Sequence, residues 1–89
     1  MPIAGNPKML AYAVSQGFQQ FTPSTLRAYT VEELKVLIFN LNVVLREVRG
    51  TQVPLEDVEA LKEKNVKIRR LNQALNTIQS FAALKGIRL

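Results

Sequence analysis

Five basic side chains between residues 62 and 70 form the strongest polar feature of the sequence. They are Lys62, Lys64, Lys67, Arg69 and Arg70. On a helix they divide between two neighbouring flanks, and amide side chains such as Gln73 and Asn76 follow them. Cations separated by amides suit contacts with the phosphates and sugars of a nucleic acid. The run is also compatible with an ordinary solvated face balanced by Glu59 and Glu63, and the sequence leaves both interpretations open.

The residue types needed for catalysis are scarce. The chain has no His and no Cys, which removes the usual general base, thiolate chemistry and the commonest metal ligands. Its seven acidic residues fall at expected helix starts or on mixed-charge faces, where carboxylates are usually structural. No glycine-rich phosphate-binding loop precedes a helix. The sequence therefore predicts a protein without enzymatic activity, metal, cofactor or small-molecule substrate.

The length and composition indicate one small helical domain, 1–89. Hydrophobic residues make up 47% of the chain, which argues against general disorder. The net charge of +5 favours polyanions or acidic surfaces as partners. No apolar run approaches the roughly 20 residues that span a bilayer. We expect a soluble intracellular protein that makes no membrane contact, in either the cytoplasm or the mitochondrial matrix.

The clearest predicted helix covers residues 31–49. Thr30 and Glu33 have the spacing of a capping box at its start. Arg46 and Arg49 suit the negative end of the helix dipole, and Gly50 suits a left-handed C-cap. Apolar residues recur three and four apart between these ends and predict one buried face. They are Leu34, Leu37, Ile38, Leu41, Val44, Leu45 and Val48.

A second, narrower apolar stripe lies on the other side of the same helix. It consists of Val36, Phe39 and Val43. A helix that is apolar on two sides needs two covering surfaces. The stripe is either core beneath an N-terminal helix or an interface for a protein partner. We take it as the candidate protein interface.

Further helices are expected on both sides of the central one. Asn6 and Pro7 predict the start of a short helix over 7–21, after a flexible tail at 1–6, although Gly17 offers an earlier end. Thr22 and Pro23 predict a break with one extra turn over 23–28. The last helix is expected over 54–85, after a four-residue loop, and it ends at Lys85-Gly86.

The apolar face of the last helix is expected to pack along the central helix. Asn65 falls between Leu61 and Ile68 on this face, where a seam Asn would fix the register of the pair. Phe81 and Leu84 are expected at its edge. The predicted seam positions are Leu55, Val58, Leu61, Ile68, Leu71, Leu75, Ile78 and Ala82.

The helix lengths predict how these elements assemble. At about 1.5 Å per residue the central and last helices span roughly 28 and 45 Å. The last helix would therefore extend about 17 Å beyond the start of the central one. We expect the N-terminal helix to cover this overhang. The sequence thus predicts an all-α fold, a long antiparallel helical hairpin with a short N-terminal third helix across its open end.

About residues 26–79 resemble the two-helix protein family numbered twenty-nine in the large ribosomal subunit, of bacterial or mitochondrial type. The resemblance lies in Leu26-Arg27 followed by Thr30-Val31-Glu32-Glu33-Leu34, in Leu37-Ile38-Phe39 with Leu41, and in Ile68-Arg69-Arg70 followed by Leu75, Thr77 and Ile78. It implies a protein that lies on ribosomal RNA near the subunit surface. The residues that would then touch phosphates are Arg27, Arg46, Arg49, Lys67, Arg69 and Arg70.

The leading functional hypothesis is a non-enzymatic structural component of a ribonucleoprotein, a large-subunit ribosomal protein in particular. It would bind RNA through these residues together with Lys62, and neighbouring proteins through Val36, Phe39 and Val43. The alternative is a self-associating helical assembly or adaptor protein, such as a virion component, without nucleic acid. A third option is a small regulator that docks its hairpin on an enzyme or polymerase.

Overall fold

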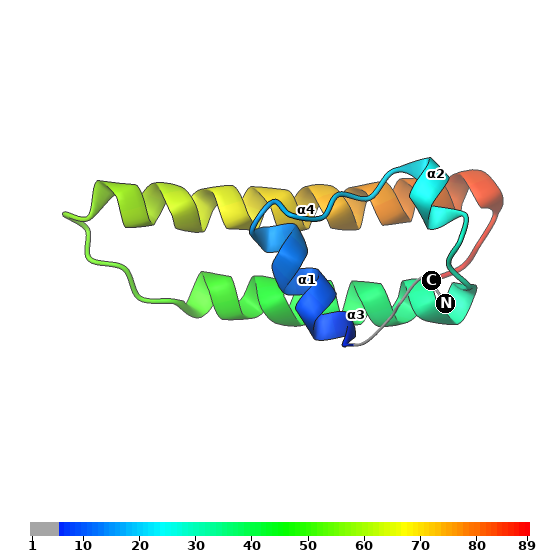
Figure 1. The fold of residues 1–89 in the computed structure, drawn as a ribbon, viewed down its shortest axis with the longest axis horizontal. Coiled ribbons are helices and arrows are strands. Elements are labelled where there is room, and N and C mark those ends of the chain that lie inside the picture. The colour runs from blue at the N-terminus through cyan, green and yellow to red at the C-terminus, as the bar shows by residue number, and fades with distance from the viewer. Residues whose placement is uncertain (1–5) are drawn as a thin grey trace.

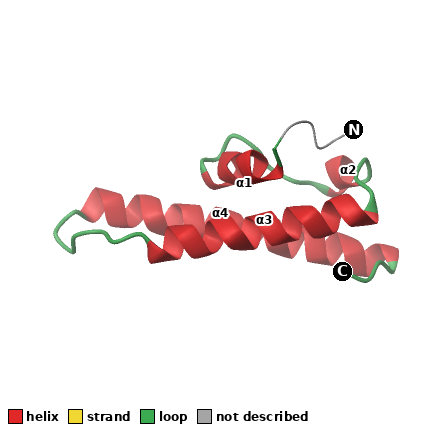
Figure 2. Cartoon of the chain, turned by 90° about the horizontal axis from the view of Figure 1, so that it is seen from below, coloured by secondary structure: helices red, strands yellow, loops and turns green. Residues whose placement is uncertain are grey.

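The computed structural model describes residues 6–89. Its helices are α1 (Pro7–Ser15), α2 (Pro23–Leu26), α3 (Val31–Gly50) and α4 (Val58–Lys85). Helices α3 and α4 run antiparallel, side by side, and α1 crosses both near the middle of the pair (Figure 1). Figure 2 shows α1 and α2 on the same side of this pair. The predicted fold class, an all-α helical hairpin with a short N-terminal helix, is confirmed.

Side-chain caps fix where the first three helices begin. The Asn6 side chain accepts a hydrogen bond from the Lys8 N–H at 2.9 Å, so the one described residue of the predicted tail caps α1; residues 1–5 lie outside the described part. The Thr30 hydroxyl accepts from the Glu33 N–H at 3.1 Å, and the Glu33 carboxylate accepts from the Thr30 N–H at 2.8 Å. Thr22 caps α2 in the same way. These three predicted starts are confirmed.

Helix α1 is shorter than the predicted 7–21 segment. It ends at Ser15 because Gly17 takes a left-handed φ of +84°, which a residue without Cβ adopts most readily. Residues 18–22 continue as a loop that runs along α4 toward α2 (Figure 1). Phe21 lies in this loop, and its side chain is buried. Its ring packs edge-to-face on that of Tyr29, with the two centroids 6.2 Å apart. The prediction of a helix as far as residue 21 is therefore wrong, although the apolar residue Phe21 is buried.

The connection between the long helices is longer than predicted. Helix α4 begins at Val58 instead of residue 54, because the Asp57 carboxylate accepts from the Ala60 N–H at 3.1 Å and caps it there. Gly50 stays within α3, and Thr51 ends that helix in an extended conformation, so the predicted left-handed cap at Gly50 is wrong. Gly86 does take a left-handed conformation and ends α4, as predicted.

The extra length of α4 projects at the opposite end from the one predicted. In Figure 1 the first turns of α4 extend past the C-terminal end of α3, beside the connecting loop. Leu55 and Val58 are therefore exposed instead of lying in the seam. The Lys64 ammonium donates to the Thr51 carbonyl at 2.9 Å and fastens the loop to α4. The prediction that the N-terminal helix covers an overhang at the open end is wrong, because α1 crosses the middle of the hairpin. The short helix α2 packs on α4 near the C-terminal end of α4.

The core lies between α3 and α4 and beneath α1 and α2. Phe81, predicted at the edge, is buried, whereas Asn65 is exposed and does not lie in the seam. Ala11 is fully buried, and its small side chain lets α1 approach the hairpin closely. No helix of residues 6–89 is long and apolar enough to cross a membrane. The largest fully buried side chains are Leu26, Leu34, Leu37, Leu41, Val44, Leu71 and Ile78.

Polar contacts also hold α1 on α3. The Lys8 ammonium lies 2.8 Å from a Glu47 carboxylate oxygen, the one ion pair among residues 6–89, and the Tyr12 hydroxyl donates to the same carboxylate. The hydrogen bond from Lys8, followed by that from Tyr12, lowers the pKa of Glu47 below its ordinary 4.5. The contact with Glu47 also raises the pKa of Lys8.

We expect acid to weaken the docking of α1. Because the folded-state pKa of Glu47 is lowered, its contribution to stability is present above the ordinary value of 4.5 and is lost as the pH falls below it. Glu47→Gln should therefore lose less stability than the wild type on acidification. Urea unfolding at a series of pH values measures this, with the exposed Glu59→Gln as control. If the difference in unfolding free energy between the wild type and Glu47→Gln does not change with pH, the contact is contradicted.

Candidate nucleic-acid interface

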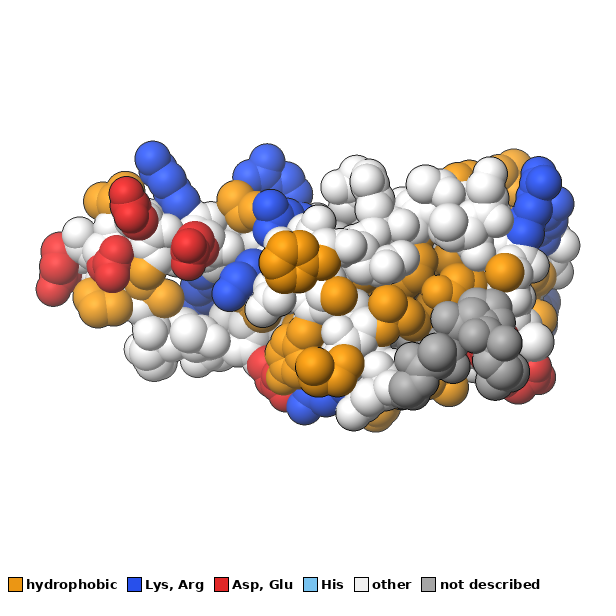
Figure 3. Space-filling view, in the orientation of Figure 1, with side chains coloured by type: hydrophobic (Ala, Val, Ile, Leu, Met, Phe, Trp, Pro, Cys, Tyr) orange, Lys and Arg blue, Asp and Glu red, His pale blue; other side chains and the backbone are white. Residues whose placement is uncertain are grey.

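The positive charge is concentrated in the C-terminal part of the chain. Residues 64–89 hold six Lys or Arg and no acidic residue, whereas residues 1–63 hold six basic and all seven acidic residues. The net charge of +5 therefore originates in α4 and the segment after it. Figure 3 shows acidic side chains gathered at the loop end of the hairpin. The acidic residues near this end are Glu56, Asp57, Glu59 and Glu63.

The side of α4 that faces away from α3 is a polar stripe without a carboxylate. Helix α4 turns Leu71, Ile78 and Ala82 toward the core, so positions half a turn away point outward. A shallow groove runs along most of this stripe, and Ile68, Phe81 and Leu84 give it an apolar lining beside the polar side chains. We call it the α4 stripe; its members are Lys62, Asn65, Arg69, Asn72, Gln73, Asn76 and Ser80.

Part of the α4 stripe was missed from the sequence alone. Asn65 was assigned to the seam, and Asn72 and Ser80 were given no role in binding. The available signal was the complete lack of acidic residues after Glu63, which marks this length of helix as suited to an anionic partner. Lys62 and Arg69, both predicted to bind RNA, are exposed on the stripe.

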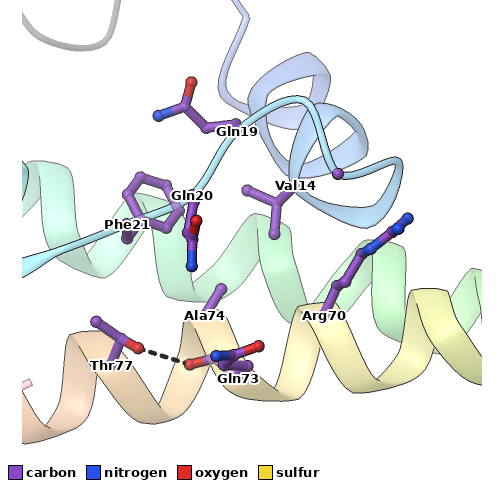
Figure 4. Close-up of a pocket in the computed structure, with 9 residues that line it drawn as sticks. Val14, Gln19, Gln20, Phe21, Arg70, Gln73, Ala74 and Thr77 are labelled. Carbon is purple, nitrogen blue, oxygen red and sulfur yellow. Dashed lines mark hydrogen bonds between the residues drawn. The ribbon is translucent and has the colours of Figure 1, made fainter.

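The Arg70 side chain makes contacts within the fold. Its guanidinium donates to the carbonyl of Ser15, the last residue of α1, at 3.1 Å. The guanidinium also packs against Gly17, where an added Cβ would lie only 3.0 Å from the Arg70 Cζ. In Figure 4 the Arg70 side chain rises from α4 to the chain reversal after α1. A cation at the C-terminal end of a helix also complements its dipole. The group predicted to bind a phosphate thus already holds α1.

Replacing Arg70 by Met keeps the apolar stem and removes the guanidinium. We expect Arg70→Met to lower the free energy of unfolding by about 1–2 kcal/mol, because a charged donor to a carbonyl is lost. Urea unfolding measures the change. Arg69→Met, on the exposed stripe, is the matched control and should stay within about 0.5 kcal/mol of the wild type. Equal losses in the two variants would contradict this role for Arg70.

A pocket of about 240 Å³ lies between the loop after α1 and α4. In Figure 4 Gln20 points from the loop toward α4, Gln19 points away from it, and Gln73 reaches the pocket from α4. Its volume is below the roughly 300–1,000 Å³ of most small-molecule sites. Because Gln73 also belongs to the α4 stripe, the pocket extends that polar surface sideways toward the loop.

The other predicted phosphate contacts do not join the α4 stripe. Arg46 is exposed on the side of α3 that faces away from α4, and Arg49 is exposed in its last turn. Arg27 follows α2 near the other end of the hairpin. Lys67 is half-buried in a depression beside the stripe, which Lys62, Glu63 and Arg70 also line. Since α3 and α4 bury their facing sides, Arg46 and Arg69 point to opposite edges. One flat nucleic-acid contact does not include all seven predicted residues.

The predicted protein interface on α3 is open at its centre. Phe39 is 67% exposed, Val36 is 41% exposed, and Val43 is half-buried. Helix α1 contacts another flank of α3, where Lys8 and Tyr12 meet Glu47. The alternative that this stripe is core beneath the N-terminal helix is therefore wrong for Phe39. In the single chain, Phe39 lies at the centre of an exposed apolar surface.

The fold and the α4 stripe together define a small helical hairpin protein with a cationic, amide-rich face. The chain matches no protein-family model, and comparisons with curated proteins and with solved structures find no significant match. The resemblance to ribosomal family twenty-nine therefore stays a prediction.

Proposed function

We propose that this protein is a non-enzymatic structural component of a ribonucleoprotein and that it binds RNA along the α4 stripe. One observation carries the proposal, the carboxylate-free outward face of α4 with Lys62, Arg69 and intervening amides. Cations attract phosphate oxygens, and amides bond to phosphates, ribose hydroxyls and base edges. The large ribosomal subunit is the assembly we favour, on the resemblance to family twenty-nine.

The composition of the stripe favours RNA over DNA. Only two full cations lie on it, so amides and a hydroxyl supply most of its hydrogen-bonding groups. The wide, shallow minor groove of A-form RNA presents 2′-hydroxyls that amides can contact, whereas DNA lacks them. From residue 62 to residue 80 the stripe extends about 27 Å along the helix, long enough to meet several nucleotides.

The salt dependence of RNA binding tests the proposal. Neutralised phosphates release counterions, so the logarithm of the binding constant falls linearly with the logarithm of salt concentration. We expect a slope of about −2 for the wild type, and the double variant Lys62→Ala/Arg69→Ala should bring it close to zero. Fluorescence anisotropy with a labelled RNA hairpin, titrated at several salt concentrations, measures both slopes.

Lys35→Ala is the matched control, because Lys35 is an exposed cation on the far side of α3. Its slope should equal that of the wild type. A DNA duplex of the same sequence should bind more weakly than the RNA. Binding that is absent, insensitive to salt, or reduced equally by Lys35→Ala would refute the proposed interface.

A second candidate function is a self-associating assembly or adaptor protein without nucleic acid. The exposure of Phe39 at the centre of an apolar surface favours it. Association of the pure chain together with an absence of RNA binding would leave this function as the better explanation.

A further inference from the structure

The outward side of α3 has the spacing of a coiled-coil seam. Its residues recur at alternating intervals of four and three, the pattern by which one helix packs along another. The buried face of α3 occupies other positions of the same helix and already packs against α4. Helix α3 therefore presents a second helix-packing face to solvent. We call it the α3 seam; its members are Glu32, Val36, Phe39, Val43 and Arg46.

We propose that the α3 seam binds a second copy of this chain, with the two α3 helices antiparallel about a two-fold axis at Phe39. The order of residue types along the seam is nearly symmetric about this position. Val36 precedes Phe39 by three residues and Val43 follows it by four, so each valine lies opposite the other valine of the partner. The two phenylalanines meet at the axis, which makes a continuous apolar centre.

The ends of the seam are charged in a complementary way. Glu32 and Arg46 lie seven residues before and after Phe39, so an antiparallel pair brings each Glu32 opposite the partner's Arg46. Both side chains are exposed, and the ion pair found within residues 6–89 joins Lys8 and Glu47 instead. A parallel pair would place like charges together at both ends, which is unfavourable. The charges therefore select the antiparallel arrangement.

The same features argue against other occupants. A nucleic acid is disfavoured because the seam is apolar at its centre and carries a carboxylate. Self-complementary contacts about a two-fold axis also close on themselves, so they give a dimer and not a filament. The α4 stripe lies on the other edge of the hairpin and stays open in this dimer. Dimer formation is thus independent of RNA binding, and either can fail without the other.

The seam is small, and we expect a weak dimer. Three apolar side chains per chain cover less than a standard protein interface, which suggests a dissociation constant of about 10 µM or weaker. Sedimentation of the RNA-free protein from low to about millimolar concentration measures it. The expected result is a monomer–dimer equilibrium. A monomer throughout this range, or growth to higher oligomers, would overturn the proposal.

Phe39→Asp tests the centre of the seam, because it places two carboxylates at the axis. The dissociation constant should rise at least about tenfold. Leu84→Asp is the matched control, since Leu84 is 84% exposed on α4 and should leave the dimer intact. Circular dichroism confirms that both variants fold. Equal dissociation constants for the wild type and Phe39→Asp would overturn the proposal.

Charge reversal tests the antiparallel arrangement. Glu32→Lys alone places two cations together at each end of the seam, and Arg46→Glu alone places two carboxylates there. Each should weaken the dimer at least about fivefold, and the double variant Glu32→Lys/Arg46→Glu should restore it. Thermal unfolding separates any cost to α3 itself. A double variant that dimerises no better than the two single variants would overturn this arrangement.

Discussion

Replacing Leu41 by Ala should lower the free energy of unfolding by about 3 kcal/mol, within the 2–5 kcal/mol range for leucine truncation in a core. Leu41 is fully buried between α3 and α4, so the substitution removes apolar contacts and leaves a cavity that the two helices do not close easily. Urea unfolding followed by circular dichroism measures the loss.

Leu84→Ala is the matched control, because it deletes the same atoms from a side chain that stays in water. It should change the free energy of unfolding by less than about 0.5 kcal/mol. A similar loss in both variants, or a larger loss for Leu84→Ala, would contradict the packing of the hairpin.

Ala11→Asp should have an effect of similar size, with a different outcome for the structure. Ala11 is fully buried where α1 lies on the hairpin, and an unpaired carboxylate there costs several kcal/mol. Because α1 is short, we expect it to leave the hairpin while α3 and α4 stay paired. Hydrogen exchange should show lost protection in α1 and retained protection in the middle of α3 and α4.

Met9→Asp is the control for this prediction, since it introduces the same charge at an exposed position of the same helix. Protection of α1 should then be retained. If Met9→Asp and Ala11→Asp release α1 equally, the burial of Ala11 against the hairpin is wrong.

The sequence predicted helix starts well where one side chain decides them. Thr30 and Glu33 bond to each other's backbone N–H groups in a capping box, and the Asn6 side chain caps α1 just before Pro7. The buried face of α3 was also predicted correctly, because its three-and-four spacing continues over about four turns. Local chemistry and regular repetition were therefore enough for these elements.

The errors arise where tertiary contacts decide between local alternatives. From the sequence, α1 could either continue through Gly17 or end there. In the structure the chain reverses at Gly17, and Gly17 packs against the Arg70 guanidinium of α4. Pro54 and Asp57 are both good helix starts, and the later one shifts the surplus length of α4 to the loop end. The residue pattern within a single helix does not show where α1 ends or where α4 begins.

The candidate site was predicted in part for the same reason. The basic run of α4 was recognised, but the hydrogen bond from Arg70 to the Ser15 carbonyl depends on where α1 ends. Arg46 was grouped with these residues, although the pairing of α3 with α4 turns it to the opposite edge. The sequence was enough to identify the basic residues. The packing of α3 against α4 places their side chains on two different faces.

Chemical-shift mapping tests the RNA interface most directly. Labelled protein is titrated with the RNA hairpin at low salt, and the backbone and side-chain amide signals are followed. We expect the largest shifts at Asn65, Arg69 and Asn76 on the α4 stripe, with α3 near Phe39 unaffected. Shifts confined to α3, or none along α4 at saturating RNA, would contradict the proposed RNA-binding face.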